Sequence, residues 1–258
     1  LMTEKAFAEG GRAMIYHAAQ FADHMVNGVV EGNQAKQEAY DDKLGFFTPI
    51  LKGFLTECGL EAANIGMQVF GGHGYIKEHG MEQIARDARI ATLYEGTTGI
   101  QALDLLGRKV LLTTRGKCVR EFTGDMLKLA KGHLLDGGPL GKMARTIAKR
   151  AIQWNVLTTR IMLRAAKDRD LVSAASVDYL MYSGYVMMAY FWAMQAFRAN
   201  ELLASGQGKE PAAFYKAKIQ TAEFYFERLL PRADAHRTGA VAPTEVIMQM
   251  DNEHFSFN

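Results

Sequence analysis

Residues 6–30 read AFAEGGRAMIYHAAQFADHMVNGVV, and this stretch decides the fold class. Its apolar side chains recur at steps of three and four residues, among them Phe7, Met14, Ala18, Phe21 and Val29. That spacing places them along one face of an amphipathic helix. The alternation typical of β-strands is nearly absent from the chain. The sequence therefore predicts an all-α protein built as a helical bundle.

The helical spacing returns along most of the chain. It predicts further helices over residues 44–69, 78–86, 142–167, 171–205 and 211–230, and a helix that opens after the turn at residues 92–98. Polar or glycine-rich stretches separate them, so residues 31–42 and 133–141 are predicted connections. The character of the sequence changes near residue 118. We therefore expect two helical domains, residues 1–117 and 118–258.

The composition argues against several classes of function. The 258 residues are 48 % hydrophobic, which permits a sizeable core, and the formal net charge is +2. No basic run carries interleaved aromatics, which argues against a nucleic-acid surface. No apolar run has the roughly 18 residues of a membrane span, and no signal peptide is recognisable. We expect a cytoplasmic protein, and the chain reads as a piece of a longer one.

Metal and nucleophile chemistry find little support. Cys58 and Cys118 lie far apart without a CxxC pair, which favours neither a zinc site nor a disulfide framework. A di-iron bundle needs Glu-x-x-His, and no Glu in the chain has a His three residues later. No elbow motif supports Ser-His-Asp chemistry. The Met- and aromatic-rich run 179–192 either lines an acyl pocket or, as its helical spacing favours, packs in a core.

The first segment that packing alone does not require is QVFGGHGY, residues 68–75. Three glycines in four residues let a backbone approach another group closely, such as a pyrophosphate or a ring system. A helix C-terminal turn with left-handed glycines explains the same composition. The glycines alone leave both interpretations open.

The second segment is YEGTTGIQ, residues 94–101. Glu95 stands in a turn at a helix start, between an aromatic residue and a glycine, and Thr97 or Thr98 can cap that helix. If the turn faces an apolar space, desolvation makes Glu95 a better general base. A solvated Glu favoured by the helix dipole is the structural alternative.

Together these motifs carry a family resemblance. QVFGGHGY at 68–75, RDAR at 86–89 and YEGT at 94–97, in this order and spacing, resemble the C-terminal helical domain of acyl-CoA dehydrogenases. The resemblance covers roughly residues 1–112. The remainder resembles the extra helical region of long bacterial members, and residues 94–104 resemble one subgroup of them. Arg86 and Asp87 are expected to form an ion pair or to anchor a turn rather than to act in catalysis.

The resemblance implies roles for individual residues. Glu95 matches the base that removes the α-proton of an acyl-CoA thioester on the way to a trans-2-enoyl-CoA, with FAD as the hydride acceptor. The cofactor contacts match Gln68, Val69, Phe70, Gly71, Gly72 and Thr97. Tyr94 and Gly96 flank the base and match positions beside the substrate.

The resemblance also implies partners and limits. The electron acceptor is expected to be electron-transferring flavoprotein, and the enzyme a homo-oligomer. Many members have a Gln that contacts FAD two residues after the Thr, where this chain has Gly99. The family's N-terminal helical domain and β domain have no counterpart in this chain, so the fragment alone is expected to be inactive. The alternative is a non-catalytic helical assembly module that retains the motif without binding FAD.

Overall fold

The computed structural model describes residues 1–168 and 170–256, and they form helices and turns without a strand. This confirms the predicted fold class. The elements follow in the order α1 (Met2–Val30), α2 (Gln34–Val69), α3 (Gly72–Tyr75), η1 (Lys77–His79), α4 (Met81–Ala91), α5 (Thr98–Leu103), η2 (Asp104–Thr113), α6 (Lys117–Lys131), α7 (Gly138–Ala165), α8 (Asp170–Ser205), α9 (Ala212–Phe224), η3 (Tyr225–Leu229), α10 (Arg232–Gly239), α11 (Glu245–Met248) and η4 (Asn252–Phe255). Among these described helices, none combines the length and the apolar character that a bilayer crossing requires.

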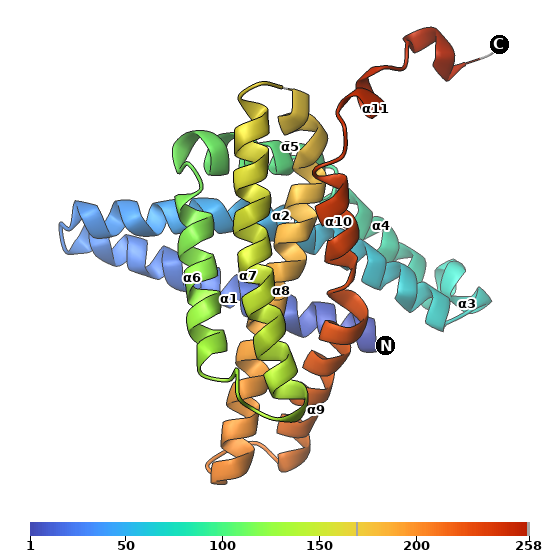
Figure 1. Ribbon diagram of the computed structural model, residues 1–258. Helices are drawn as coiled ribbons and strands as arrows, with labels where there is room; N and C mark the ends of the chain where they lie inside the picture. The colour runs from blue at the N-terminus through green and yellow to red at the C-terminus, as the bar shows by residue number, and fades with distance from the viewer. Residues whose placement is uncertain (169, 257–258) are drawn as a thin grey trace.

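Helices α1 and α2 form a long antiparallel hairpin (Figure 1). The polar stretch 31–42 is not the connection that its composition predicted, because only Glu31–Asn33 lies outside the helices. Asn33 starts α2 by accepting a hydrogen bond from the Lys36 N–H at 3.0 Å. The Gln, Lys, Glu and Ala residues that follow are good helix formers. Their polarity therefore reflects an exposed arm of the hairpin rather than a loop.

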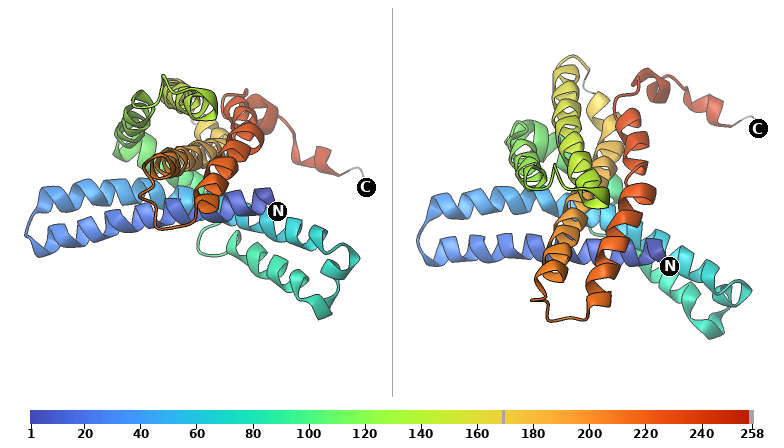
Figure 2. Two further views of the ribbon diagram at one scale, coloured as in Figure 1. Left: turned by 90° about the horizontal axis from the view of Figure 1, so that it is seen from below. Right: turned by 60° about the horizontal axis from the view of Figure 1, so that its bottom comes forward.

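A second layer of helices, α6 to α10, runs across this hairpin (Figures 1 and 2). Helix α8 lies at its centre, and nearly all of the run 179–192 is buried there. The interpretation of that run as core packing is confirmed. Helix α6, which the sequence did not predict, also packs here through Val119, Phe122 and Met126. Pro211 is the N-cap of α9, so this helix begins at Ala212, one residue after its predicted start.

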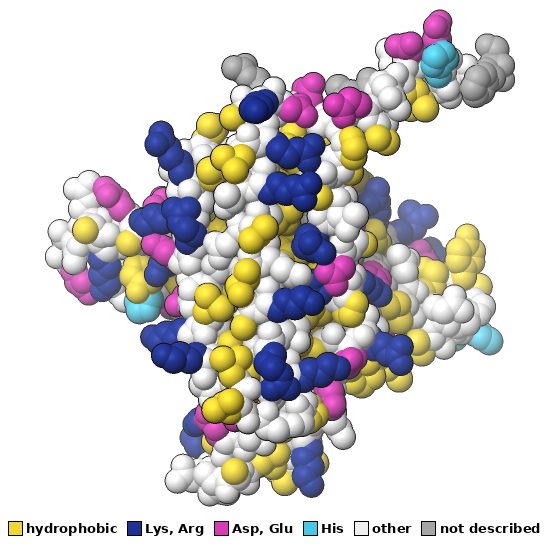
Figure 3. Space-filling view, viewed as in Figure 1, with side chains coloured by type: hydrophobic (Ala, Val, Ile, Leu, Met, Phe, Trp, Pro, Cys, Tyr) yellow, Lys and Arg dark blue, Asp and Glu magenta, His cyan; other side chains and the backbone are white. Residues whose placement is uncertain are grey.

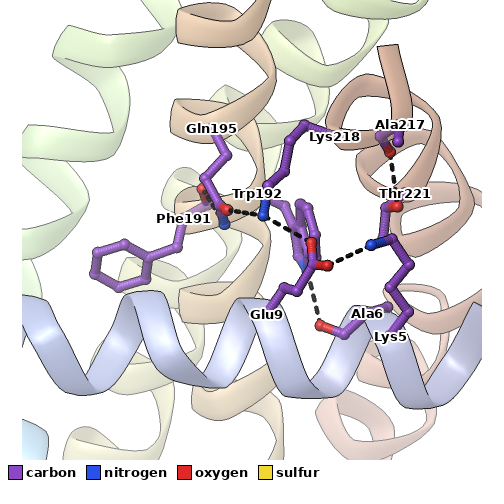
Figure 4. Close-up of polar contacts among 9 residues, drawn as sticks. All are labelled: Lys5, Ala6, Glu9, Phe191, Trp192, Gln195, Ala217, Lys218 and Thr221. Carbon is purple, nitrogen blue, oxygen red and sulfur yellow. Dashed lines mark hydrogen bonds and ion pairs between the residues drawn. The ribbon is translucent and has the colours of Figure 1, made fainter. Parts of the chain in front are cut away.

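The two layers meet through close contacts and polar links. A Cβ at Gly184 would lie 2.1 Å from the Phe54 ring, so α8 and α2 cross in near contact at this glycine. Trp192 donates its indole N–H to the Ala6 carbonyl at 3.1 Å, and Lys218 of α9 reaches Glu9 of α1 at 2.7 Å (Figure 4). One hydrophobic cluster includes buried residues from both predicted domains. The boundary near residue 118 stays a prediction.

The C-terminal end of α2 leads into the arm that carries the two motifs. The chain turns through α3 and η1 and returns along α2 as α4, which spans Met81–Ala91 instead of the predicted 78–86. Gly80, which has a left-handed φ of +71°, turns the chain just before α4 begins. The turn 92–97 then leads into α5, which continues without interruption as the π-helical segment η2.

Candidate active site

Glu95 lies in the turn between α4 and α5 with a left-handed backbone, at φ +54°. Gly96 follows at φ +92°. A left-handed non-glycine residue costs roughly 1–2 kcal/mol and persists only where its surroundings hold it. The Glu95 side chain is exposed, and the backbone N–H of Glu95 makes no hydrogen bond among the described residues. The turn therefore presents a carboxylate and a free backbone donor together.

Lys52, in the middle of α2, forms hydrogen bonds to the backbone of this turn. Its ammonium group donates to the carbonyls of Ala91 at 2.7 Å, Tyr94 at 2.9 Å and Gly96 at 2.7 Å. The Tyr94 ring, with its residue half exposed, lies 5.9 Å from the same nitrogen. Ala91 ends α4, where unpaired carbonyls and the helix dipole favour a nearby cation.

Further contacts fix the start of α5. The Thr97 hydroxyl accepts a hydrogen bond from the Ile100 N–H at 3.3 Å, so Thr97 is the cap. The Thr98 hydroxyl donates instead to Glu57 of α2 at 2.6 Å. The Gln101 amide reaches the Glu95 carbonyl at 3.4 Å. Each contact ties the turn either to α5 or to α2.

The glycine segment forms the corner at the end of α2. Gln68, Val69 and Phe70 are exposed, and Gly71 is left-handed at φ +61°. A Cβ at Gly71 or Gly72 would meet no atom within 4 Å, so the backbone is open on this side. Gly74 differs, because a Cβ there would lie 2.2 Å from the Met67 carbonyl oxygen. Packing thus requires Gly74, whereas Gly71 and Gly72 expose backbone.

The two motifs lie at different points along α2, although Gln68 of the first and Thr98 of the second line the same groove. Lys52, beside the Glu95 turn, and Gln68 are 16 positions apart on α2, about 24 Å along its axis. A ligand in the groove can contact Gln68 and Thr98 together, whereas the Lys52 end of the Glu95 turn lies farther from the α2 corner.

Both segments are open enough to receive parts of a dinucleotide such as FAD. The backbone at Gly71 and Gly72 is uncovered, with the exposed side chains of Val69 and Phe70 beside it. A Cβ at Gly99 would lie 3.9 Å from its nearest neighbour, the Thr97 hydroxyl oxygen. The Ile100 N–H is taken by the Thr97 cap, so among the described residues only the Thr98 and Gly99 N–H groups at the start of α5 are without a hydrogen bond and could face an anion.

A groove of about 650 Å³ lies next to the turn, between α2 and α8. Glu57, Asn64 and Gln68 contribute from α2, and Met181 and Tyr185 from α8. Cys58 also lies in its wall, but burial raises the pKa of this thiol well above its ordinary value. The thiol therefore stays protonated and is a poor nucleophile.

Arg86 and Asp87 do not pair with each other. Arg86 contacts Glu82 at 3.1 Å, and Asp87 accepts a hydrogen bond from Gln83 at 2.8 Å. Both contacts lie within exposed turns of α4. The expectation of an ion pair between Arg86 and Asp87 is wrong, because neighbours four residues away on the same helix face meet more easily.

Known families match both parts of the chain. A family described as "Acyl-CoA dehydrogenase, C-terminal domain" matches residues 5–111. Another, described as "Acetyl-CoA dehydrogenase C-terminal like", matches residues 119–251. The chain belongs to the acyl-CoA dehydrogenase family. The resemblance drawn from the motifs is thereby confirmed.

Two characterised relatives cover nearly the whole chain. The 3-methylmercaptopropionyl-CoA dehydrogenase of Ruegeria pomeroyi is 34 % identical over 239 residues, 92 % of this chain and 39 % of the relative. The "Broad-specificity linear acyl-CoA dehydrogenase FadE5" of Mycobacterium tuberculosis is 31 % identical over 265 residues, 98 % of this chain and 41 % of the relative. The subgroup resemblance of residues 94–104 is to the first of these types. The chain thus spans about two fifths of the relatives it matches.

A solved structure shares the fold of this acyl-CoA dehydrogenase chain. It is ACDH-11 of Caenorhabditis elegans, crystallised in complex with C11-CoA. The match covers 96 % of this chain and 39 % of the ACDH-11 chain. The TM-score is 0.61 at 18 % sequence identity. This similarity establishes the helical architecture of the fragment.

Lys52 is the residue that sequence analysis missed. It lies 42 residues before Tyr94 in the chain, and nothing in a single helical lysine indicates three carbonyl partners. Glu57, which holds Thr98, was missed for the same reason. Long-range contacts of this kind follow from how α2 and α5 pack.

Proposed function

We propose that this chain is the C-terminal part of a flavin-dependent acyl-CoA dehydrogenase in which Glu95 is the catalytic base. The enzyme oxidises the Cα–Cβ bond of an acyl-CoA thioester to a trans-2-enoyl-CoA. The observation that carries the proposal is the Glu95 turn, where a left-handed backbone presents an exposed carboxylate and a Glu95 N–H that has no hydrogen-bond partner among the described residues. Tyr94 and Gly96 border the substrate on either side of the base.

The chemistry requires both groups. The α-proton of a thioester is weakly acidic, so its removal needs a carboxylate held against the carbon and a donor near the thioester oxygen. The Glu95 carboxylate takes the proton, and the Glu95 N–H donates to the oxygen where negative charge develops. When bound, FAD supplies the hydride acceptor for the β-hydrogen.

The cofactor contacts fall into two places. Gln68, Val69, Phe70, Gly71 and Gly72 would hold an adenosine end at the α2 corner, and Thr97 would lie near the pyrophosphate or ribityl part. The family resemblance implies that the α2 corner contacts the FAD of a neighbouring subunit in a homo-oligomer. Electrons would then leave to electron-transferring flavoprotein.

Replacing the base tests this function. In the full-length enzyme, Glu95→Gln keeps the shape of the side chain but cannot accept a proton. Turnover with an acyl-CoA should fall on the order of 10²–10⁴-fold while bound flavin, measured by absorbance, stays stoichiometric. Near-normal turnover of this variant would rule out the base assignment.

Flavin content distinguishes the enzyme from an assembly module without FAD. The full-length parent should purify with stoichiometric flavin and oxidise an acyl-CoA. A folded parent that neither retains added FAD through desalting nor oxidises any acyl-CoA would favour the assembly module.

A further inference from the structure

Lys52 makes an unusual set of contacts for a half-buried lysine. An ammonium group has three N–H donors and no acceptor. In this chain all three donors reach backbone carbonyls, those of Ala91, Tyr94 and Gly96, at 2.7–2.9 Å. No carboxylate is among these hydrogen-bond partners. The positive charge is therefore directed at one turn of backbone.

Two of the three carbonyls bracket Glu95. Across a trans peptide the C=O and the following N–H point in opposite directions. The Tyr94 carbonyl points to Lys52, so the Glu95 N–H points away from α2. The Gly96 carbonyl is held in the same way, and this fixes the Gly96–Thr97 peptide plane, so Lys52 anchors the peptides before and after the Glu95–Gly96 peptide.

The backbone that Lys52 holds is otherwise unfavourable. Glu95 and Gly96 are both left-handed, at φ +54° and +92°. The other hydrogen bond to this pair, from Gln101 to the Glu95 carbonyl, is long at 3.4 Å. Without Lys52, little else among the described contacts keeps Glu95 in a conformation that non-glycine residues rarely adopt.

We propose that Lys52 is the positioning residue of the Glu95 turn: it orients the Tyr94–Glu95 and Gly96–Thr97 peptides, which stand on either side of the Glu95–Gly96 peptide, so that the carboxylate and the Glu95 N–H face the substrate together. This inference rests on the proposed role of Glu95 as base. Lys52 touches neither substrate nor cofactor and acts through the backbone. A displacement of about 1 Å in a reacting group can lower a rate on the order of 10²-fold.

The test uses the full-length enzyme and separates proton abstraction from the redox step. Acyl-CoA is incubated with each variant in D₂O, and deuterium entering at the α-carbon is followed by NMR. Lys52→Met should lower this exchange and kcat on the order of 10²-fold, with little change in KM and with flavin still bound. A residue with only a structural role would lower the melting temperature without this selective loss.

Lys218→Met is the matched control. Lys218 is also largely buried and also links two helices, through Glu9 at 2.7 Å and Gln195 at 3.4 Å, but it lies between α1, α8 and α9 (Figure 4). Its loss should lower the melting temperature and leave α-exchange near the wild-type rate. If Lys52→Met exchanges as fast as Lys218→Met, the positioning role is wrong.

Two more variants separate a failure to fold, a wrong role for Lys52 and a wrong role for Glu95. Lys52→Arg retains the charge, but its planar donors cannot converge on three carbonyls from one point. It should fold and still lose at least about tenfold in exchange, so normal exchange in a folded Lys52→Arg would overturn the proposal even if Lys52→Met fails to fold. Glu95→Gln is measured alongside: if it exchanges normally, the proposed function fails, whereas slow Glu95→Gln with fast Lys52→Met overturns only the role of Lys52.

Discussion

At the scale of single residues, Gly96, which follows the proposed base Glu95, is a position where a side chain is poorly tolerated. Its φ of +92° disfavours any L-residue, and a Cβ would lie 2.6 Å from the Gln101 amide nitrogen. Gly96→Ala should therefore displace the Glu95 turn. We expect kcat/KM of the full-length enzyme to fall at least about tenfold, with a melting temperature only a few degrees lower.

Gly59→Ala provides the comparison, because a Cβ at Gly59 in α2 meets no atom within 4 Å. It should leave kcat/KM unchanged and the melting temperature equal or higher. Equal kinetics in Gly96→Ala and Gly59→Ala would show that the conformation of the turn does not matter for catalysis.

The residue scale is also where the sequence was most and least informative. Thr97 was one of two predicted caps and is the one that accepts from Ile100, since helix capping depends on neighbours within four residues. The roles proposed for Glu95 and for Gln68–Gly72 stay predictions, although the structure shows these residues exposed. Lys52 and Glu57 were unpredictable because their partners lie about 40 residues away.

At the scale of elements, the crossing of α2 and α8 depends on a glycine. A Cβ at Gly184 would come within 2.1 Å of the buried Phe54 ring. Gly184→Ala should therefore push the helices apart and lower the free energy of unfolding by about 1–3 kcal/mol. Urea unfolding followed by circular dichroism measures the loss.

Gly124→Ala is the control for that substitution. Gly124 is exposed in α6, and a Cβ there meets nothing within 4 Å. Alanine should stabilise this helix by about 0.5–1 kcal/mol. If both alanine variants shift stability in the same direction, close packing at Gly184 is not what joins the two layers.

The link between α7 and α10 predicts an acid-sensitive stability. Arg150 binds Asp234 through both terminal nitrogens, at 2.6 and 2.8 Å. These hydrogen bonds hold the pKa of Asp234 below its ordinary value of 3.8. A carboxyl whose folded-state pKa is lowered stabilises the protein above its unfolded-state pKa of about 3.9, and that stability is lost as the pH falls through the folded-state pKa.

Asp234→Asn should remove this contribution. Because Asp234 is partly exposed, we expect a loss on the order of 1–2 kcal/mol at neutral pH and a flatter decline of stability below about pH 4. Glu201→Gln, which breaks an exposed pair with Arg198, is the comparison and should change little. An unchanged acid-side profile in Asp234→Asn would contradict the account of this ion pair.

Helices were predicted well where the apolar periodicity is strong, and poorly where a polar helical segment was taken for a loop. The long runs of α7 and α8 were recognised, with ends displaced by a few residues. The start of α2 was misread as a connection, because the hairpin arm is exposed on most sides and lacks an apolar face there. Helix α6 was missed because its short apolar face follows a turn at Gly116.

At the scale of the whole molecule, the helices after residue 117 complete the core of those before it. Ile50 and Phe54 of α2 are fully buried within a cluster that includes much of α8. We therefore expect deletion of residues 118–258 from the full-length enzyme to leave an aggregated or monomeric, inactive protein. Light scattering after size-exclusion chromatography measures the mass. A deletion variant that keeps its oligomeric mass and activity would contradict this.

Charge is distributed unevenly over the molecule, although the net charge of +2 suggests balance. Residues 138–167, which include α7, contain seven Lys and Arg residues and no Asp or Glu. Lys and Arg side chains accordingly stand out on the face that α7 and α10 present in Figure 3. The total composition could not reveal this, because acidic residues elsewhere in the chain offset the positive charge of this segment.

The 258-residue chain alone should neither hold FAD tightly nor oxidise an acyl-CoA. The segments that we propose as cofactor contacts, Gln68–Gly72 and Thr97, would hold only the adenosine and pyrophosphate ends. A preformed site must bury most of a ligand to bind it tightly. The check is bound flavin after adding excess FAD and desalting. Stoichiometric yellow protein that is reduced by an acyl-CoA would show that the fragment contains the complete site.

The most direct test of the central claim is α-proton exchange by the full-length enzyme in D₂O with Glu95 replaced. The wild type should incorporate deuterium at the α-carbon of an acyl-CoA, and Glu82→Gln, which changes a partly buried carboxylate paired with Arg86 on α4, should do so at a similar rate. Glu95→Gln should retain its flavin and exchange on the order of 10²–10⁴-fold more slowly. Exchange by Glu95→Gln at the wild-type rate would mean that another group removes the proton and that the account of this turn is wrong.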